Sequence, residues 1–469
     1  MPSISRTIGG NERMVSSSRH FPVVVPATAG HCGRPNVNSP SPGLQVPKPQ
    51  PLHFSTVVGS SIISPVQVDS IPLSWQSILL SDALKRELIE NTLNTSIKFL
   101  DELLPCERLP FPVDTNLLRK LSAPVGTKAA IWNFARNCFR QPPTDFGDFG
   151  EDAVCNWLND IGAAMGRIYG RQCRRLWWSG NCGMPLPKRA LILLDRSDYG
   201  RVLQKAFPGN EWAFVKSLVE VHRKPDTTAA KLYLTFLCQP HHRFIISLSF
   251  INTERGQFSI TVTDRAGRIR VNTMDLMGSS AENGLQLLSI LAFLFFGSPK
   301  DIGLDPNFQI NPVNGQVVAI KCGLRRFEVV KRVHALQSPF GRGTQVWIVS
   351  HEGIKYILKD SWVRENRIYD EVAHLSKIKH YKELEDRVPT LICGGDVVIN
   401  GTRDSTRRYR SAHSLAGPHL VHRCIVTSPV GEPITSCRSK KEFIGIMMNI
   451  ITSMLTDTLI RVNLCMHHP

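Results

Sequence analysis

Residues 341–371 read G-R-G-T-Q-V-W-I-V-S-H-E-G-I-K-Y-I-L-K-D-S-W-V-R-E-N-R-I-Y-D-E. Two glycines open the segment, Gly341 and Gly343, and without a Cβ their backbone can come close to phosphate oxygens. Residues 346–350 have the pattern of a strand, and His-Glu-Gly then forms a tight hairpin to a second strand at residues 354–359. The segment therefore predicts a phosphate-binding loop on an antiparallel hairpin.

Lys359 ends the second strand, on the same face as Ile357 because side chains alternate along a strand. In a Tyr-Ile-Leu-Lys strand that follows a glycine loop, the lysine is the group that neutralises the α- and β-phosphates of a nucleotide. A carboxylate on the next helix must then hold the ammonium in place. Glu371 is the first candidate for this carboxylate, and Glu365 is the second.

Several motifs of the sequence, taken in order, resemble the fungal-type protein kinases. They read R-R-L-W-W-S-G-N-C, D-I-G-L-D-P, G-R-G-T, Y-I-L-K-D-S-W, V-P-T-L-I-C-G-G-D-V-V-I-N-G and H-R-C-I-V-T-S-P-V-G-E-P-I, and the likeness runs from about residue 75 to about residue 455. The resemblance implies an α+β fold in which a protein-kinase-like small lobe, an antiparallel sheet plus an αC-like helix, follows a separate α/β domain. It also implies ATP and Mg as cofactors and phosphoryl transfer to Ser or Thr of a protein substrate.

The resemblance also implies which residues bind ATP. They are Gly341, Gly343, Val346, Ile357, Lys359, Glu371, Thr427 and Gly431. Val346 stands where the ordinary kinase loop has its third glycine, which is a departure from the pattern. Thr427 lies near the gatekeeper position, and residues 428–431 form the linker beside adenine, which is recognised through backbone groups. Gly431 suits a bend between lobes.

A kinase also needs a catalytic-loop aspartate, an asparagine for one magnesium and a D-F-G aspartate. None of these follows Lys359, so no catalytic residue and no metal ligand is predicted. D-F-G occurs twice within residues 145–150, but it precedes the lysine instead of following it. His422-Arg423-Cys424 resembles H-R-D, yet a cysteine cannot take the role of the aspartate. We expect a kinase domain truncated before its catalytic loop, without turnover on its own.

Composition sets broader limits. A formal charge of +17 favours acidic partners, but the basic residues are spread along the chain, so nucleic acid is a weak expectation. The 12 cysteines form no C-x-x-C pair, which favours reduced thiols in an intracellular protein, cytoplasmic or nuclear, over a disulfide or zinc framework. The longest apolar run, residues 285–296, is too short for a membrane span and predicts a buried helix.

Three regions are expected along the chain. Residues 1–73 are rich in Ser, Pro and Gly and predict a disordered leader, residues 74–300 an α/β domain, and residues 313–469 the small lobe. The apolar spacing predicts helices at 75–104, 116–139, 151–169, 228–237, 283–296 and 442–459, and strands at 174–178, 190–195, 214–222, 244–250, 258–264 and 268–272.

An alternative function rests on the first domain. Asp195 ends a predicted strand, Glu220 and His222 share a face of the next strand, and Glu151 on the preceding helix could join them around a metal, as in nuclease-like domains. The lysine that such nucleases need is replaced by His222, so a non-catalytic relative is the stronger form of this idea. The simplest interpretation leaves Asp195 at a turn and Glu220 solvated. The second hypothesis is therefore a binding or scaffold protein whose first domain docks a protein or nucleic acid.

Overall fold

The computed structural model describes residues 92–95, 104–124, 129–140, 142–143, 150–181, 189–203, 211–222, 228–251, 256–277, 280–335, 338–367, 370–378, 380–381, 388–410, 419–432 and 436–452. All of them belong to one compact unit, Ser64–Pro469. The predicted leader, residues 1–73, and both D-F-G motifs up to Phe149 lie outside the described residues.

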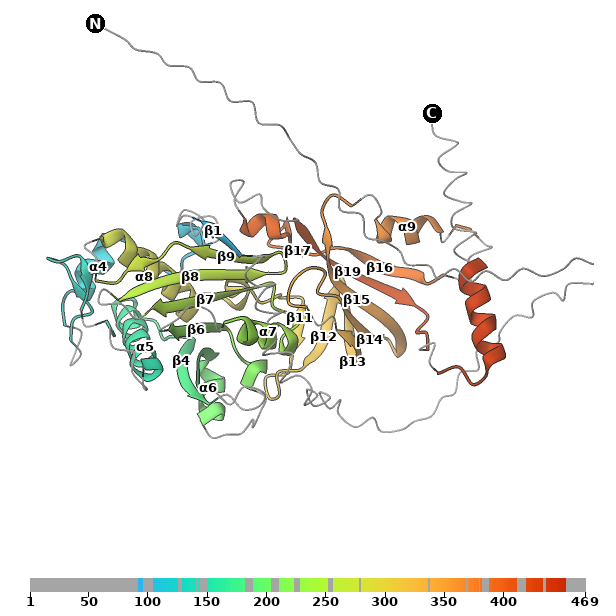
Figure 1. The fold of residues 1–469 in the computed structure, drawn as a ribbon, viewed down its shortest axis with the longest axis horizontal. Helices are drawn as coiled ribbons and strands as arrows, with labels where there is room; N and C mark the ends of the chain where they lie inside the picture. The colour runs from blue at the N-terminus through green and yellow to red at the C-terminus, as the bar shows by residue number, and fades with distance from the viewer. Residues whose placement is uncertain are drawn as a thin grey trace, which may run out of the picture. The chain divides into compact units, whose positions relative to one another are not determined.

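The first sheet has eight strands in the order β1-β9-β8-β7-β6-β5-β4, with β10 paired to β8 (Figure 1). Its strands are β1 (Thr92–Thr95), β4 (Arg175–Asn181), β5 (Arg189–Asp195), β6 (Ser217–His222), β7 (Phe244–Ile251), β8 (Gln257–Asp264), β9 (Gly267–Val271) and β10 (Met274–Asp275). The β1–β9 and β6–β7 pairs are parallel, and the other pairs are antiparallel.

Helices cover both faces of this sheet. They are α4 (Thr115–Leu121), α5 (Gly150–Tyr169), α6 (Arg196–Leu203), α7 (Thr228–Cys238) and α8 (Ala281–Phe296), together with the 3-10 turns η1 (Cys106–Arg108), η2 (Glu211–Ala213) and η3 (Pro299–Ile302). Leu191 and Leu193 of β5 pack with α4, α5 and α8, whereas Ile192 and Leu194 pack with α7 and η2. This alternation is what a strand covered on both sides requires.

The apolar run at residues 285–296 forms the buried part of α8, as predicted. From Leu291 to Phe295 every side chain is buried, and the Phe295 ring lies against Gly162 of α5 so closely that a Cβ there would be 2.7 Å from the ring. Among the described helices, none combines the length and the apolar character that a bilayer span requires.

The second sheet is antiparallel throughout, in the order β11-β12-β13-β14-β15-β19-β16. Its strands are β11 (Phe308–Ile310), β12 (Val317–Cys322), β13 (Arg325–Ala335), β14 (Gln345–His351), β15 (Ile354–Arg364), β16 (Thr390–Asp396) and β19 (Leu420–Ser428). Helix α9 (Glu371–Ile378) follows β15, and the short pieces β17 (Val398–Ile399), β18 (Thr402–Arg403) and η5 (Thr406–Tyr409) lie between β16 and β19 in the chain. Residues 440–452 are also helical.

The hairpin predicted at residues 351–353 is confirmed. It joins β14 to β15 with Glu352 and Gly353 as its two turn residues, both at positive φ (52° and 79°), which matches the twist of the flanking strands. The mixed α+β class is confirmed as well, and the strands and helices predicted between residues 151 and 296 are found within three residues of their expected ends.

Two predicted helices are wrong where the structure describes them. The helix expected at 116–139 ends at Leu121, because Pro124 follows, and β2 (Trp132–Asn133) and β3 (Cys138–Phe139) then form a hairpin that buries Trp132. The helix expected at 75–104 contains β1, whose backbone pairs in parallel with β9 and forms the edge of the first sheet. In both places tertiary burial or backbone pairing outweighs the helical spacing of apolar residues.

Arg175 on β4 joins α8 to the first sheet. Its guanidinium is buried and donates to the carbonyl oxygens of Leu294 (2.9 Å) and Gly297 (3.0 Å) at the end of α8, while Nε donates to Asp195 (3.0 Å). We predict that Arg175→Met destabilises the protein by about 3–5 kcal/mol, because it leaves a carboxylate and two carbonyl groups without their donor. Urea unfolding measures this loss.

The neighbouring Arg174 is exposed and provides the matched control. Arg174→Met should change the free energy of unfolding by no more than about 0.5 kcal/mol. Equal losses in the two variants would show that the buried contacts of Arg175 do not stabilise the fold.

Candidate functional site

An ion pair joins the second sheet to the helix that follows it. Lys359 Nζ on β15 donates to both carboxylate oxygens of Glu371, the first residue of α9, at 2.8 Å each. The Lys359 side chain is 26% exposed and that of Glu371 36%, so solvent and solutes reach the pair. This is the contact expected from the sequence. Glu365, the second candidate, pairs instead with Arg403 (3.5 Å) and Arg407 (3.2 Å).

Four of the residues expected to bind ATP share one face of the second sheet. Val346 on β14 lies opposite Lys359, and Ile357 lies opposite Thr427 on β19. Directly opposed residues of antiparallel strands point to the same side, as do Ile357 and Lys359, which are two residues apart. The sheet therefore places an ammonium group beside two aliphatic side chains and a hydroxyl.

Asp370 fixes the start of α9. Its Oδ1 accepts from the backbone N–H groups of Val372 (2.9 Å) and Ala373 (3.1 Å), which is a helix N-cap. Arg423 of β19 forms an ion pair with Asp370 (2.7 Å) and donates to Asp396 of β16 (2.8 Å). Through these contacts Arg423 holds Glu371, the next residue, beside β15.

The role of Arg423 was missed in the sequence, where residues 422–424 were read only as an incomplete H-R-D motif. A signal was available, because Arg423 stands in a largely apolar stretch, residues 420–427, and a charge on a buried strand requires an acidic partner.

The glycine segment is anchored to the first sheet. Phe340 packs into the cluster around α7, Gly341 N–H donates to the carbonyl oxygen of Arg265 (2.6 Å), and Arg265 Nη1 donates to the carbonyl oxygen of Pro339 (3.1 Å). A Cβ on Gly343 would lie 2.9 Å from Arg265 Nε. The turn between β8 and β9, which carries Arg265, therefore occupies one side of the segment.

Both glycines adopt conformations that favour glycine, with φ of 79° at Gly341 and 48° at Gly343. Between them, the carbonyl oxygen of Arg342 accepts from Trp362 N–H (2.7 Å), three residues beyond Lys359 on β15. Three residues along a strand correspond to about 10 Å, so the backbone of Arg342 contacts β15 about 10 Å from Lys359. A Cβ on Gly431 would meet no atom within 4 Å.

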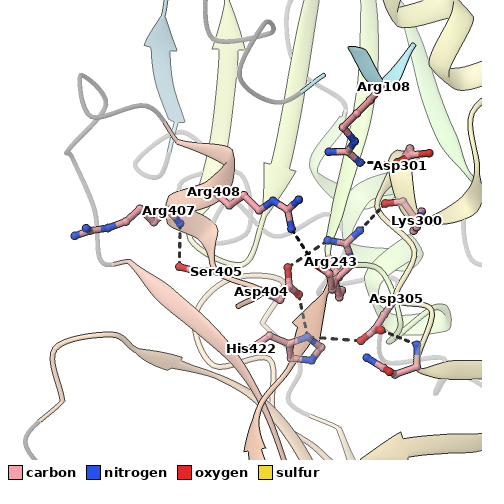
Figure 2. A network of polar contacts seen from close by, with 12 residues as sticks. Arg108, Arg243, Lys300, Asp301, Asp305, Asp404, Ser405, Arg407, Arg408 and His422 are labelled. Atoms are coloured by element: carbon pink, nitrogen blue, oxygen red, sulfur yellow. Dashed lines mark hydrogen bonds and ion pairs between the residues drawn. The ribbon is translucent and has the colours of Figure 1, made fainter. Parts of the chain in front are cut away.

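A buried charge network surrounds His422 of β19 (Figure 2). Nε2 lies 2.8 Å from Asp360, while Nδ1 lies 3.1 Å from Asp404 and 3.6 Å from Asp305. The ring stacks on Trp362 at 4.7 Å. Burial alone would disfavour the imidazolium, but the carboxylates outweigh it and raise the pKa of His422 well above its usual value. The residue resembling the His of H-R-D is therefore a buried structural cation.

Further contacts extend this network to the first sheet. Arg243 donates to Asp404 (3.2 Å) and to the carbonyl oxygen of Lys300 (2.5 Å) (Figure 2). Arg410 donates to both oxygens of Asp264 at the end of β8 (2.6 and 3.2 Å). The segment of residues 404–410 is thus tied by buried ion pairs to residues that precede β11.

The metal constellation considered for the first domain is not assembled. The β5–β6 pairing sets Leu193 opposite Ser217, so Asp195 and Glu220 lie five residue positions apart along the sheet, roughly 17 Å. Asp195 pairs with Arg175 (3.0 Å) and Lys216 (3.7 Å), and Glu220 with Lys231 (2.6 Å).

Antiparallel pairing keeps Asp195 and Glu220 apart, because the end of β5 lies beside the start of β6. Glu220 is buried, so its interpretation as a solvated residue is wrong. The side chain of His222 lies outside the described residues. Over the part of the chain that the structure describes, no group of His, Cys, Asp and Glu residues is arranged to hold a metal ion.

Comparison with known proteins gives one match. Residues 209–419 match the model of a family described as fungal protein kinase. The match covers β6 to β10 of the first sheet and β11 to β16 of the second. It includes Gly341, Lys359 and Glu371, and it ends before β19, Thr427 and Gly431. No curated protein and no solved structure matches the chain.

We predict that Arg423→Met loosens α9. The change leaves Asp370 with Arg367 (3.4 Å) and Asp396 with Arg403 (2.7 Å), and it should cost about 1.5–3 kcal/mol, as for hydrogen bonds to charged groups. Hydrogen exchange should become faster at the amides of α9, because the helix start is no longer held to β16 and β19. Arg326→Met, which breaks an exposed ion pair with Glu328, is the control and should leave this exchange unchanged. Equal exchange in both variants would contradict the anchoring role.

The charge network also predicts a pH dependence. Burial raises the pKa of Asp305 to about 6, above the unfolded value near 4. A raised pKa means that the folded state binds the proton more tightly, so this contribution to stability is present below about pH 4 and lost as the pH rises through about 6.

Asp305→Asn cannot titrate, so relative to wild type it should gain up to about 3 kcal/mol between pH 4 and pH 7. Urea unfolding over this range, with the exposed Glu328→Gln as control, measures the difference. A wild-type minus variant difference that does not change with pH would show that Asp305 does not carry the proton.

Proposed function

Because residues 209–419 match the fungal protein kinase family model, we propose that the second sheet and α9 bind ATP as a protein kinase small lobe does. The observation that carries the proposal is the Lys359–Glu371 pair, formed between a strand and the helix that follows it. In kinases this pair places the ammonium where it contacts the α- and β-phosphates. An ammonium has three donors, and Glu371 takes two of them, so one is left for a phosphate oxygen.

The neighbouring side chains suit the rest of a nucleotide. Val346 and Ile357 offer an aliphatic surface for adenine on the face that carries Lys359, and Thr427 lies at the end of β19 beside the linker of residues 428–431. Gly341 and Gly343 would bring backbone N–H groups near the phosphates. Since Gly341 N–H already donates to Arg265, we assign the main phosphate contact to Lys359.

Magnesium would arrive with ATP and screen the phosphate charge. We propose residues 74–300 and 313–469 as the two domains that meet at the glycine segment and at the His422 network. In this arrangement the first domain would hold the glycine segment, which corresponds to the loop that covers the nucleotide in a kinase.

Phosphoryl transfer to Ser or Thr of a protein is the activity of the family. It requires a catalytic aspartate and metal-binding residues in addition to Lys359, and the printed sequence has neither motif after that lysine. Our proposal for this chain alone is therefore nucleotide binding without turnover. A complete catalytic site would be needed for the transferase activity.

Calorimetric titration of ATP with magnesium into the full chain tests the proposal. Lys359→Met should weaken binding at least about tenfold, because it removes a charge-assisted hydrogen bond to phosphate. Lys377→Met changes an exposed lysine on α9 and should bind ATP as the wild type does. Absence of binding in all three folded proteins would contradict the proposal and favour the alternative of a binding or scaffold protein.

A further inference from the structure

One cavity of the described structure is lined by none of the residues of the candidate ATP site. It has a volume of about 420 Å3 and lies between β6, the loop after α7, the η3 turn and β11. Lys216, His241, Lys300 and Asp305 supply its polar groups, and Leu304 and Phe308 are among its apolar groups. This volume is within the range of small-molecule sites, roughly 300–1,000 Å3.

His241 lines one side of the cavity. The His241 side chain is 4% exposed, and its Nδ1 makes no hydrogen bond to any described residue. The ring stacks on that of His242 with centroids 5.7 Å apart. Burial holds the pKa of His241 well below its usual value, so the ring is neutral and can donate one N–H. Nδ1 has almost no accessible surface, so a ligand in the cavity would contact the ring through its other atoms.

Two lysines give the cavity its charge. Lys216 is 8% exposed, and burial lowers the pKa of its ammonium group, while Asp195 (3.7 Å) and Asp198 offset part of its charge. Lys300 Nζ donates to the neutral amide oxygen of Asn400 (3.0 Å). The one acid of the lining, Asp305, faces His422. Positive charge in the cavity is therefore only partly compensated.

We propose that this cavity binds a small organic anion, a carboxylate or phosphate monoester attached to an apolar group. Lys216 and Lys300 bind the anionic end beside the His241 ring. Leu304 and Phe308 contact the apolar end. The ligand would lie next to Asp305, which is 3.6 Å from His422 of β19. Asp305 therefore connects the cavity to β19.

Phenyl phosphate is the probe, titrated calorimetrically into the full chain at pH 7.5. We expect saturable binding to one site that is at least about tenfold weaker in Lys300→Met, since a charge-assisted contact is lost. Ile310→Trp should abolish binding, because Ile310 is a half-buried residue of the cavity wall and the larger ring fills the space. Both positions are only partly buried, and circular dichroism verifies that the variants fold.

Controls separate this site from other causes of binding. Lys321→Met removes an exposed lysine from β12 and should bind phenyl phosphate as the wild type does. Inorganic phosphate should bind more weakly than phenyl phosphate, and benzylamine, a cation of similar shape, should not bind.

Four results would overturn the proposal. They are absence of saturable phenyl phosphate binding by the folded protein, equal affinity in the wild type and the two cavity variants, equal affinity for inorganic phosphate or benzylamine, and displacement of the probe by saturating ATP with magnesium, which would place it at Lys359.

Discussion

The buried cation of His422 is the constraint on which the arrangement of this protein depends. Its ring lies among three carboxylates that come from different parts of the chain, Asp305 before β11, Asp360 on β15 and Asp404 after β18. A charge without a partner in such a place would be prohibitive, whereas a charge among several opposite charges is tolerated. The segments that carry these carboxylates must therefore meet at one point.

Arg243 and Arg410 extend the same requirement to the first sheet. Both arginines are buried. Arg243, which precedes β11 in the chain, is neutralised by Asp404, which follows it, and Arg410, which follows β11, is neutralised by Asp264, which precedes it. The Arg265 turn and Phe340 add a hydrogen-bonded and apolar contact at the glycine segment. The orientation of the second sheet against the first is thus set mainly by paired charges, which tolerate little displacement because hydrogen-bond geometry is narrow.

The position of the candidate nucleotide site follows from this framework. Strand β19 carries His422 and Arg423 side by side, pointing to opposite faces of the sheet. His422 holds the sheet to the preceding segments, and Arg423 holds the start of α9 through Asp370. Glu371 reaches Lys359 because His422 fixes the position of the sheet and Arg423 fixes the start of α9. The same network borders the cavity beside Asp305, so both candidate sites depend on buried ion pairs.

The sequence by itself determined the local elements of this protein and the chemistry of its candidate site. The Glu352-Gly353 turn, the alternation along β15 and the apolar spacing of α8 follow from short-range sterics and periodicity. The pairing of Lys359 with an acid on the next helix is what the kinase-type motif implies. The tertiary structure alone decided the partners of buried charges and the pairing of edge segments. Thr92–Thr95 became β1 because the edge of β9 offered backbone partners, and Glu220 is buried because Lys231 neutralises it. The glycine segment packs on Arg265, 76 positions before Gly341 in the printed sequence. Contacts between residues so far apart leave no periodic trace in a single sequence, since their free energy depends on burial that exists only in the folded chain.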